Sequence, residues 1–321
     1  MLLRVSIFTR DIINAESLAK QVFLIVLCRY TAERRFFMNI DGKTIQLAVI
    51  GNPIEHTFSP AIHNYIAAQE GDNCIYGAWR VLPEDLADAV KGVRALNVRG
   101  INVTIPHKIE IMKYLDEIST SAALLGSVNT VVNRDGRLCG YNTDADGFYK
   151  AISNAGAQIE DADVLMIGAG GVVLPLLLKI IEHKPKSVTL VNRSENKARK
   201  LRETAFERTG FKVGESVEKE RYGLVINTTS AGMAPQLDAL PIDAIEGIES
   251  LDFIDRDTFV TDLIYNPEET KFLKEAKMRG AKILNGLDML INQATLAYEI
   301  FMDKKLPDDM GERIKKGVFG R

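Results

Sequence analysis

The sequence has few of the residues that build metal sites and disulfide frameworks. Cysteine occurs three times and histidine four times in 321 residues. Cys28, Cys74 and Cys139 lie far apart, which argues against a disulfide framework and predicts a protein of the reducing cytoplasm. No C-x-x-C or H-x-x-x-H spacing occurs, so we expect no metal ion.

The sequence also lacks a surplus of charge and a long apolar run. A net charge of -3 gives no electrostatic reason to expect nucleic acid or a membrane surface as a partner. No apolar stretch approaches the roughly 18 residues that span a membrane. The hydrophobic share of 46% and the charged share of 26% are typical of a globular protein. Because 321 residues exceed what one core usually holds, we expect two domains.

Short apolar runs alternate with helical patterns along the chain. This order predicts an α/β fold, in which helices connect the strands of parallel sheets. Ser59 fits the N-cap of a helix, Pro60 its first position and Gly71 its end. Residues 134–136 (RDG) predict a tight turn between two strands. The predicted strands are 45–51, 99–105, 127–133, 137–141, 164–168, 188–191, 224–228, 259–263 and 281–284.

The segment 102–108 (NVTIPHK) combines the end of a strand with a proline and a lysine. Proline suits the first position of a helix, so the pattern predicts a helix over 106–114. Lys108 then lies in the first turn, where the positive end of the helix dipole disfavours a cation. Such an environment suits acid–base chemistry. The alternative is a surface lysine at a frayed helix start.

Five further motifs extend over most of the chain. They are GNPIEHTFSPAIHN at 51–64, GSVNT at 126–130, GYNTDADG at 140–147, GAGG at 168–171 and NGLDMLINQ at 285–293. In this order they resemble the shikimate dehydrogenase family, whose members use NADP to reduce 3-dehydroshikimate to shikimate. The resemblance runs from about residue 45 to about residue 306. It implies the same reversible reaction, a step of chorismate and aromatic amino acid biosynthesis.

The resemblance also implies a domain organisation. A discontinuous N-terminal α/β substrate domain, comprising 38–145 and 288–321, would hold the catalytic residues. A Rossmann-type NADP-binding domain would comprise 146–287. Residues 1–37 precede every motif, so we interpret them as an extension and Met38 as the functional start. An amphipathic docking helix is the alternative for this extension.

Two segments point to the cofactor. The glycine-rich turn follows an apolar strand and precedes a helix, as in dinucleotide-binding folds, although Val173 replaces the last glycine of G-x-G-x-x-G. At the end of the next strand an NAD enzyme has an acidic residue, whereas this chain has Asn192 and Arg193, which suit the 2′-phosphate of NADP. A plain turn and a solvated basic helix start are the alternatives. The resemblance implies cofactor contacts by Gly168, Ala169, Gly170, Gly171, Asn192, Arg193, Ser194, Lys197, Leu263 and Gly286.

The substrate residues are likewise implied by the resemblance. Lys108 and Asp144 are the catalytic pair, with the lysine as proton donor and the aspartate orienting it. The substrate, shikimate or 3-dehydroshikimate, carries a carboxylate and hydroxyls, so its pocket needs polar partners. The implied substrate contacts are Thr57, Ser59, Thr104, Asn129, Tyr265 and Gln293. Each also has a purely structural alternative as a cap or turn former.

Several interpretations stay open at this point. His56, His63 and His107 have no acidic or thiol partner at an informative spacing, so we interpret them as packing residues or residues behind the site. Thr57 departs from the family's serine, which leaves the preference between shikimate and quinate open. A nucleotide-binding sensor without catalysis is the rival of another class, and related enzymes that act on aminated substrates are a further one. The sequence allows a monomer or a homodimer.

Overall fold

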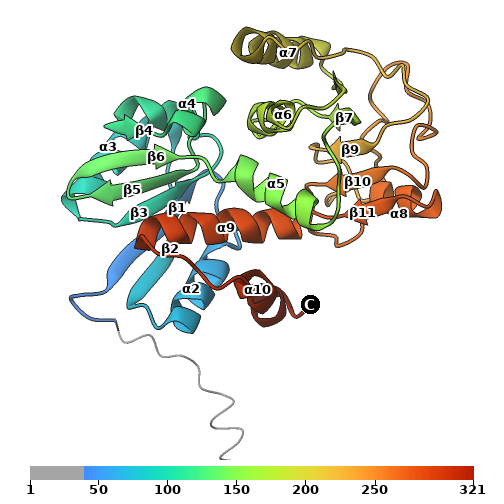
Figure 1. Cartoon of the computed structure of the whole chain (residues 1–321). Coiled ribbons are helices and arrows are strands. Elements are labelled where there is room, and N and C mark those ends of the chain that lie inside the picture. The colour runs from blue at the N-terminus through green and yellow to red at the C-terminus, as the bar shows by residue number, and fades with distance from the viewer. Residues whose placement is uncertain (1–39) are drawn as a thin grey trace, which may run out of the picture. The chain divides into compact units, whose positions relative to one another are not determined.

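The structure, a computed structural model, describes residues 40–321, and residues 43–321 form one compact unit. The predictions for residues 1–37 and for a start at Met38 lie outside the described residues. Two β-sheets with helices packed on them make up the unit (Figure 1). The α/β fold class is confirmed, with a discontinuous N-terminal domain and a Rossmann-type domain.

The first sheet has six strands in the order β2-β1-β3-β5-β6-β4. Its strands are β1 Ile45–Gly51, β2 Cys74–Arg80, β3 Gly100–Val103, β4 Glu117–Ile118, β5 Thr130–Arg134 and β6 Arg137–Tyr141. The helical elements between them are α2 Ser59–Glu70, η1 Pro83–Asp85, α3 Leu86–Ala95, η2 Glu110–Tyr114 and α4 Thr120–Leu125. β1 pairs in parallel with β2 and β3, whereas β5 runs antiparallel to β3 and β6.

From Leu47 to Gly51, β1 is buried on both faces, which explains the apolar sequence of that stretch. Leu47 and Val49 pack in the cluster that includes α2 and the C-terminal helices, while Ala48 and Ile50 pack with α3 on the other side. The predicted turn between β5 and β6 is confirmed. Asp135 has φ 53° and Gly136 φ 88°, the left-handed pair that a two-residue hairpin turn requires.

The second sheet has five parallel strands in the order β11-β10-β9-β7-β8. They are β7 Asp163–Ile167, β8 Ser187–Val191, β9 Leu224–Asn227, β10 Phe259–Asp262 and β11 Lys282–Leu284, with helices α6 Val173–Glu182, α7 Glu195–Thr209 and α8 Lys271–Met278. All five strands coincide, within a residue or two, with the predicted ones. The strand order reverses between β7 and β9, and ligands of such sheets bind beyond the carboxyl ends at the point of reversal.

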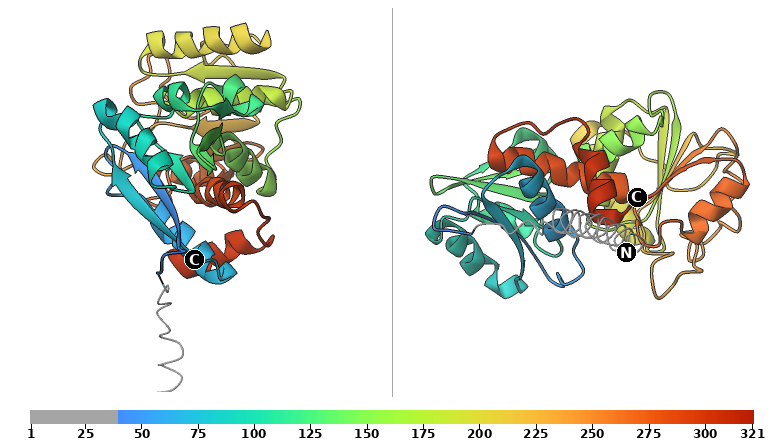
Figure 2. Two further views of the ribbon diagram at one scale, coloured as in Figure 1. Left: turned by 90° about the vertical axis from the view of Figure 1, so that its left-hand side faces the viewer. Right: turned by 90° about the horizontal axis from the view of Figure 1, so that it is seen from below.

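Two helices connect the sheets. α5 Asp144–Asn154 leads from the first sheet to the second, and α9 Leu287–Met302 leads back, followed by α10 Met310–Phe319. The two connecting helices lie side by side (Figure 1), so closely that a Cβ on Gly147 would come within 2.7 Å of the Gln293 backbone nitrogen. Figure 2 shows from below that the two sheets lie on opposite sides of α9. None of the helices that the structure describes is long and apolar enough to cross a membrane.

Three local predictions are wrong. In place of the predicted helix 106–114 the structure has only the short 3-10 helix η2. The Lys108 carbonyl accepts a hydrogen bond from the Val128 amide and not from an amide one helical turn further along. The helix-dipole reasoning for Lys108 therefore has no basis. Ser59 is the first residue of α2 and Phe58 its N-cap, without a side-chain cap. The strand β2 was not predicted because its last three residues are exposed and its apolar pattern is too short.

Candidate active site

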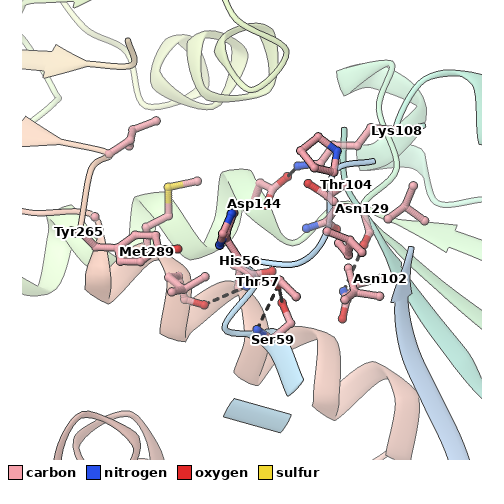
Figure 3. Close-up of a pocket in the computed structure, with 18 residues that line it drawn as sticks. His56, Thr57, Ser59, Asn102, Thr104, Lys108, Asn129, Asp144, Tyr265 and Met289 are labelled. Carbon is pink, nitrogen blue, oxygen red and sulfur yellow. Dashed lines mark hydrogen bonds and ion pairs between the residues drawn. The ribbon is translucent and has the colours of Figure 1, made fainter. Parts of the chain in front are cut away.

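A cavity of about 390 Å³ lies where loops from both sheets meet (Figure 3). Ten of the residues singled out from the sequence line it, from segments up to more than two hundred residues apart. They are Thr57, Ser59, Thr104, Lys108, Asn129, Asp144, Leu263, Tyr265, Gly286 and Gln293. The structure thus brings together all the predicted substrate and catalytic residues, and two of the predicted cofactor residues, Leu263 and Gly286.

Lys108 and Asp144 form an ion pair in the wall of this cavity. The Lys108 Nζ lies 2.7 Å from the Asp144 Oδ2, and the two side chains are 20% and 11% exposed. Lys108 comes from the turn after β3, and Asp144 is the first residue of α5. The side chain of Asn142 fixes this helix start: its Oδ1 accepts from the Asp144 amide at 3.0 Å and its Nδ2 donates to the Ser127 carbonyl. A held ammonium beside open space can donate a proton to a bound oxygen.

Two hydroxyls stand at the start of α2, on another wall of the cavity (Figure 3). The Thr57 Oγ1 donates to the Ser59 Oγ at 3.1 Å and accepts from the Ser59 amide at 3.2 Å. The capping role that the sequence assigned to Ser59 is therefore filled by Thr57, whose hydroxyl accepts a hydrogen bond from an amide at the helix start. Hydroxyls and the positive end of a twelve-residue helix suit an anionic group such as a carboxylate.

A buried amide network forms the floor of the cavity. The Asn129 Oδ1 accepts from the Thr143 amide at 2.8 Å, which ties the loop before β5 to the loop before α5. Asn102, which sequence reasoning left without a role, also lines the cavity. Its Oδ1 accepts from the Tyr76 hydroxyl at 2.6 Å and its Nδ2 donates to the Thr130 Oγ1 at 3.0 Å. An asparagine in an otherwise β-branched strand end was the signal that could have identified it.

The second sheet contributes the opposite wall through the loop after β10. The buried Asp262 carboxylate accepts from the Asn227 Nδ2 and the Ile264 amide, both at 3.0 Å, and from the Thr270 hydroxyl at 2.7 Å. Burial raises the pKa of Asp262 to about 6, against the opposing effect of these donors. The network fixes the backbone that presents Leu263 and Tyr265 to the cavity.

Gly286 packs directly against this loop. A Cβ at this position would overlap the Leu263 backbone carbonyl, so only glycine fits here. Tyr265 is partly buried, and burial raises its pKa. Its ring meets Phe58 edge to face, with centroids 5.8 Å apart, so the loop after β10 contacts the residue before α2.

The three histidines of the motifs differ in their surroundings. The His107 ring is buried and bonds the Val81 carbonyl at 2.8 Å. His63 is buried and stacks on Tyr76 at 4.1 Å between centroids, and burial lowers its pKa to about 3. Both are packing residues, as interpreted from the sequence. His56 is exposed and lines the cavity, so it is neither a packing residue nor a residue behind the site, as the sequence had suggested (Figure 3).

A second cavity, of about 600 Å³, lies at the carboxyl ends of β7, β8 and β9. Among its lining residues are the predicted cofactor residues Gly168, Ala169, Gly170, Asn192, Arg193, Ser194 and Lys197. Gly171 is in the turn before α6 and does not line it. Four further lining residues were not predicted from the sequence, namely Thr228, Thr229, Ser230 and Gln236.

The geometry of this second cavity suits a dinucleotide. Gly168 has φ 122°, and a Cβ there would overlap the Thr228 Oγ1, so the strand-to-helix turn needs glycine. Pro175 is the third residue of α6. The N–H groups of the first helical turn have no acceptor within the helix, so a proline there breaks no helical hydrogen bond. Arg193 and Lys197 are exposed, and neither forms an ion pair within the described part of the chain. Their charge is available to an anionic ligand.

The part of the chain that the structure describes contains no group of three or more His, Cys, Asp or Glu residues that could hold a metal ion. Cys74 and Cys139, the two cysteines within it, are buried free thiols. The ionisable and polar groups that line the first cavity include the lysine–aspartate pair and the hydroxyls and amides around it.

Comparison with known proteins gives a consistent result. The profile described as the shikimate dehydrogenase substrate binding domain matches residues 49–131. The chain is 41% identical to the shikimate dehydrogenase (NADP(+)) of Methanocaldococcus jannaschii over 269 residues, which cover 82% of this chain and 93% of that protein.

Solved structures resemble the fold as well. A shikimate dehydrogenase in complex with NADP+ has a TM-score of 0.79 and 38% identity, covering 85% of this chain and 95% of the other. The enzyme from Thermus thermophilus, in complex with NADP(H) and shikimate, has a TM-score of 0.74 and 32% identity, covering 86% and 100%. With a relative this similar along nearly its whole length, the chain belongs to the shikimate dehydrogenase family.

Proposed function

We propose that this protein catalyses the reversible, NADPH-dependent reduction of 3-dehydroshikimate to shikimate, a step of aromatic amino acid biosynthesis. The observation that carries the proposal is the 2.7 Å pair of Lys108 and Asp144 in the wall of a polar cavity that both sheets share. Carboxylate, hydroxyl and carbonyl groups of the substrate each find a complementary group in that cavity.

The residues present fit NADP. Glycine at position 168 lets the turn lie directly against Thr228, and the open space at the Cβ positions of Gly170 and Gly171 lets a phosphate approach the backbone. The loops after β7 and β8 surround a cavity large enough for the adenosine half. Arg193 and Lys197 would pair with the 2′-phosphate, as guanidinium and ammonium groups do with dianions. Leu263 and Gly286 would lie beside the nicotinamide. When bound, NADPH supplies the hydride that reduces the carbonyl carbon.

The protein's own side chains carry out the proton transfer. As the carbonyl oxygen gains negative charge, the Lys108 ammonium donates a proton to it and the alcohol forms. In the oxidation of shikimate the same nitrogen takes the proton back. Asp144 holds the ammonium in place between turnovers. Such general acid–base catalysis contributes about 10²- to 10⁴-fold to a rate.

The remaining residues would position the ring. Thr57 and Ser59 would bind the carboxylate at the start of α2, opposite the lysine. Thr104, Asn129 and Gln293 would bind the ring hydroxyls. Tyr265 would close the cavity beside the cofactor. Because a site built of hydrogen-bonding groups is left with unpaired polar atoms when a ligand lacks one of its hydroxyls, we expect strong discrimination against such analogues.

Quinate is the second candidate substrate, because Thr57 stands at the proposed carboxylate site, where shikimate and quinate differ. The methyl group of Thr57 changes the shape of that site, so the two acids are compared in the same assay. A sensor without catalysis would be expected to lack Lys108 or Asp144, and both are present. The presence of this pair does not discriminate against aminated analogues, which belong in the same assay.

We also propose the domain boundaries 38–145 with 288–321, and 146–287, and a monomer or homodimer in the cytoplasm without nucleic-acid partners. Two buried free thiols support a reducing location. Size-exclusion chromatography with light scattering gives the oligomeric state, and cell fractionation tests the location.

A substrate and cofactor panel tests the proposed function. Initial rates are measured with NADP and with NAD for shikimate, quinate and an aminated analogue. We expect the highest kcat/KM for shikimate with NADP, exceeding the value with NAD by about tenfold to a hundredfold, since hydrogen bonds to a charged phosphate contribute about 1.5–3 kcal/mol. If quinate or the aminated compound gave a higher kcat/KM than shikimate, that compound would be the substrate and the proposal would be wrong.

A further inference from the structure

The helix that begins at the proposed 2′-phosphate site carries an unfavourable charge. α7 starts at Glu195, directly after Asn192, Arg193 and Ser194. From 192 to 202 the chain has five cationic residues and one acidic residue, and the acidic one is Glu195. An anion next to this site repels a 2′-phosphate, whereas NAD enzymes use an acidic residue at this place to bind the ribose 2′-hydroxyl.

The structure shows how the Glu195 carboxylate is held. Arg202, two turns further along α7, has a side chain that is only 7% exposed. Its Nη1 donates to the Leu190 carbonyl at 3.0 Å and lies 3.4 Å from the Glu195 Oε2, while its Nη2 pairs with the Glu195 Oε1. The same Nη2 lies 3.6 Å from the Glu215 Oε2. A buried guanidinium anchored on the backbone of β8 thus binds both oxygens of the carboxylate.

This pairing leaves the cations of the site unneutralised. Arg199 pairs with Glu203 at 3.9 Å, and Glu195 is occupied by Arg202. Within the described residues no carboxylate is paired with Arg193 or Lys197, which both line the cavity. We propose that Arg202 is a specificity-determining residue, which secures the preference for NADP by keeping the Glu195 carboxylate away from Arg193, Lys197 and the 2′-phosphate.

The proposal rests on the proposed function, in which Arg193 and Lys197 bind the 2′-phosphate. Arg202 does not itself line the cavity, so it acts through Glu195 and not by contact with the cofactor. Without Arg202, Glu195 is free to turn toward Arg193 or Lys197, and the phosphate has to compete with it. A unit charge at about 6–8 Å from a partly solvated phosphate changes its affinity by about three- to tenfold.

Binding constants for NADP and NAD test the inference. The variants are Arg202→Met, which removes the charge and keeps the length, Glu195→Gln, and the double variant. We expect Arg202→Met to weaken NADP binding about three- to tenfold and NAD binding less than about twofold. The double variant restores NADP affinity to within about twofold of the wild type, because no carboxylate is left to compete. Arg202→Lys, which keeps a charge but cannot bind both oxygens, gives an intermediate loss.

Three controls separate this mechanism from others. Arg199→Met removes an exposed arginine of the same helix and should change neither affinity by more than about twofold. Melting temperatures report any loss of folding from the unpaired Leu190 carbonyl. Arg193→Ala tests the underlying site: if it weakens both cofactors equally, the phosphate is bound elsewhere and the proposed function needs revision. If Arg193→Ala is selective for NADP but the double variant binds NADP as weakly as Arg202→Met, the role of Arg202 alone is contradicted.

Discussion

Asn227 donates a 3.0 Å hydrogen bond from its amide to the buried carboxylate of Asp262, and so joins the carboxyl ends of β9 and β10. The loop after each strand depends on this contact. Asn227 also accepts from the Thr229 amide and hydroxyl at the cofactor cavity, and Asp262 accepts from the Ile264 amide beside the substrate cavity. One pair of buried side chains therefore supports walls of both cavities.

The pKa of Asp262 predicts a pH-dependent contribution to stability. Burial raises it from the ordinary 3.8 to about 6, so between these values the unfolded chain ionises this group and the folded chain does not. The folded state then binds more protons, and the free energy of unfolding falls as pH rises from about 4 to about 6, by about 3 kcal/mol in total. Asp262→Asn removes this dependence. Urea unfolding of both proteins across the interval measures it, with the exposed Asp252→Asn as control, and parallel pH curves for wild type and Asp262→Asn would contradict the assignment.

Arg193→Ala should weaken NADP binding by about 1.5–3 kcal/mol and leave NAD binding nearly unchanged, since the lost partner is specific to the 2′-phosphate. Isothermal titration of each cofactor into both proteins measures the effect. An equal loss for the two cofactors would show that Arg193 has a structural role.

Gly286→Ala should damage the wall of the substrate cavity. The added Cβ overlaps the Leu263 carbonyl, so the loop after β10 or the start of α9 has to move. We expect a loss of about 1–3 kcal/mol in stability and a raised KM for both cofactor and substrate. Gly92→Ala, a glycine of α3 with open space at its Cβ, is the matched control and should be neutral or stabilising. A variant at 286 with unchanged melting temperature and KM would refute the packing account.

A chain that starts at Met38 should fold and be active. The residues that line the two cavities lie between positions 49 and 293, and the first strand begins at Ile45. Melting temperature and kcat/KM of the full-length and shortened proteins, with and without NADP, provide the comparison. Insolubility of the shortened chain, or a fall in kcat/KM of more than about tenfold, would mean that the first 37 residues support the fold.

The sequence predicted the second sheet well because its strands from β7 to β10 are largely buried and rich in apolar residues. In β7, Val164 and Met166 pack against one layer of helices and Leu165 and Ile167 against the other, so residues 164–167 are an unbroken apolar run. β2 gave no such signal: it is an edge strand whose last residues are exposed, and its pairing with β1 is a long-range contact. Local patterns carry no information on such pairing.

The prediction at the candidate site depended on motifs, and it failed where tertiary contacts override local preference. Lys108 was expected in a helix, but its carbonyl is bound by the distant Val128 amide. Ser59 was expected as a cap, but the Thr57 hydroxyl satisfies the amide. Asn102 and Asp262 were not assigned roles, because their importance comes from partners that lie far away in the sequence. Residue type indicated the chemistry, and only the fold showed which groups meet.

In the proposed mechanism the Lys108 ammonium, held by Asp144, transfers the proton in a reaction between shikimate and NADP. The most direct test is the turnover of Lys108→Ala, measured together with its NADP affinity. We predict that kcat falls by about 10²- to 10⁴-fold while NADP affinity changes little, because Lys108 lines the substrate cavity and not the cofactor cavity. A variant that keeps more than about half of the wild-type kcat would contradict the claim.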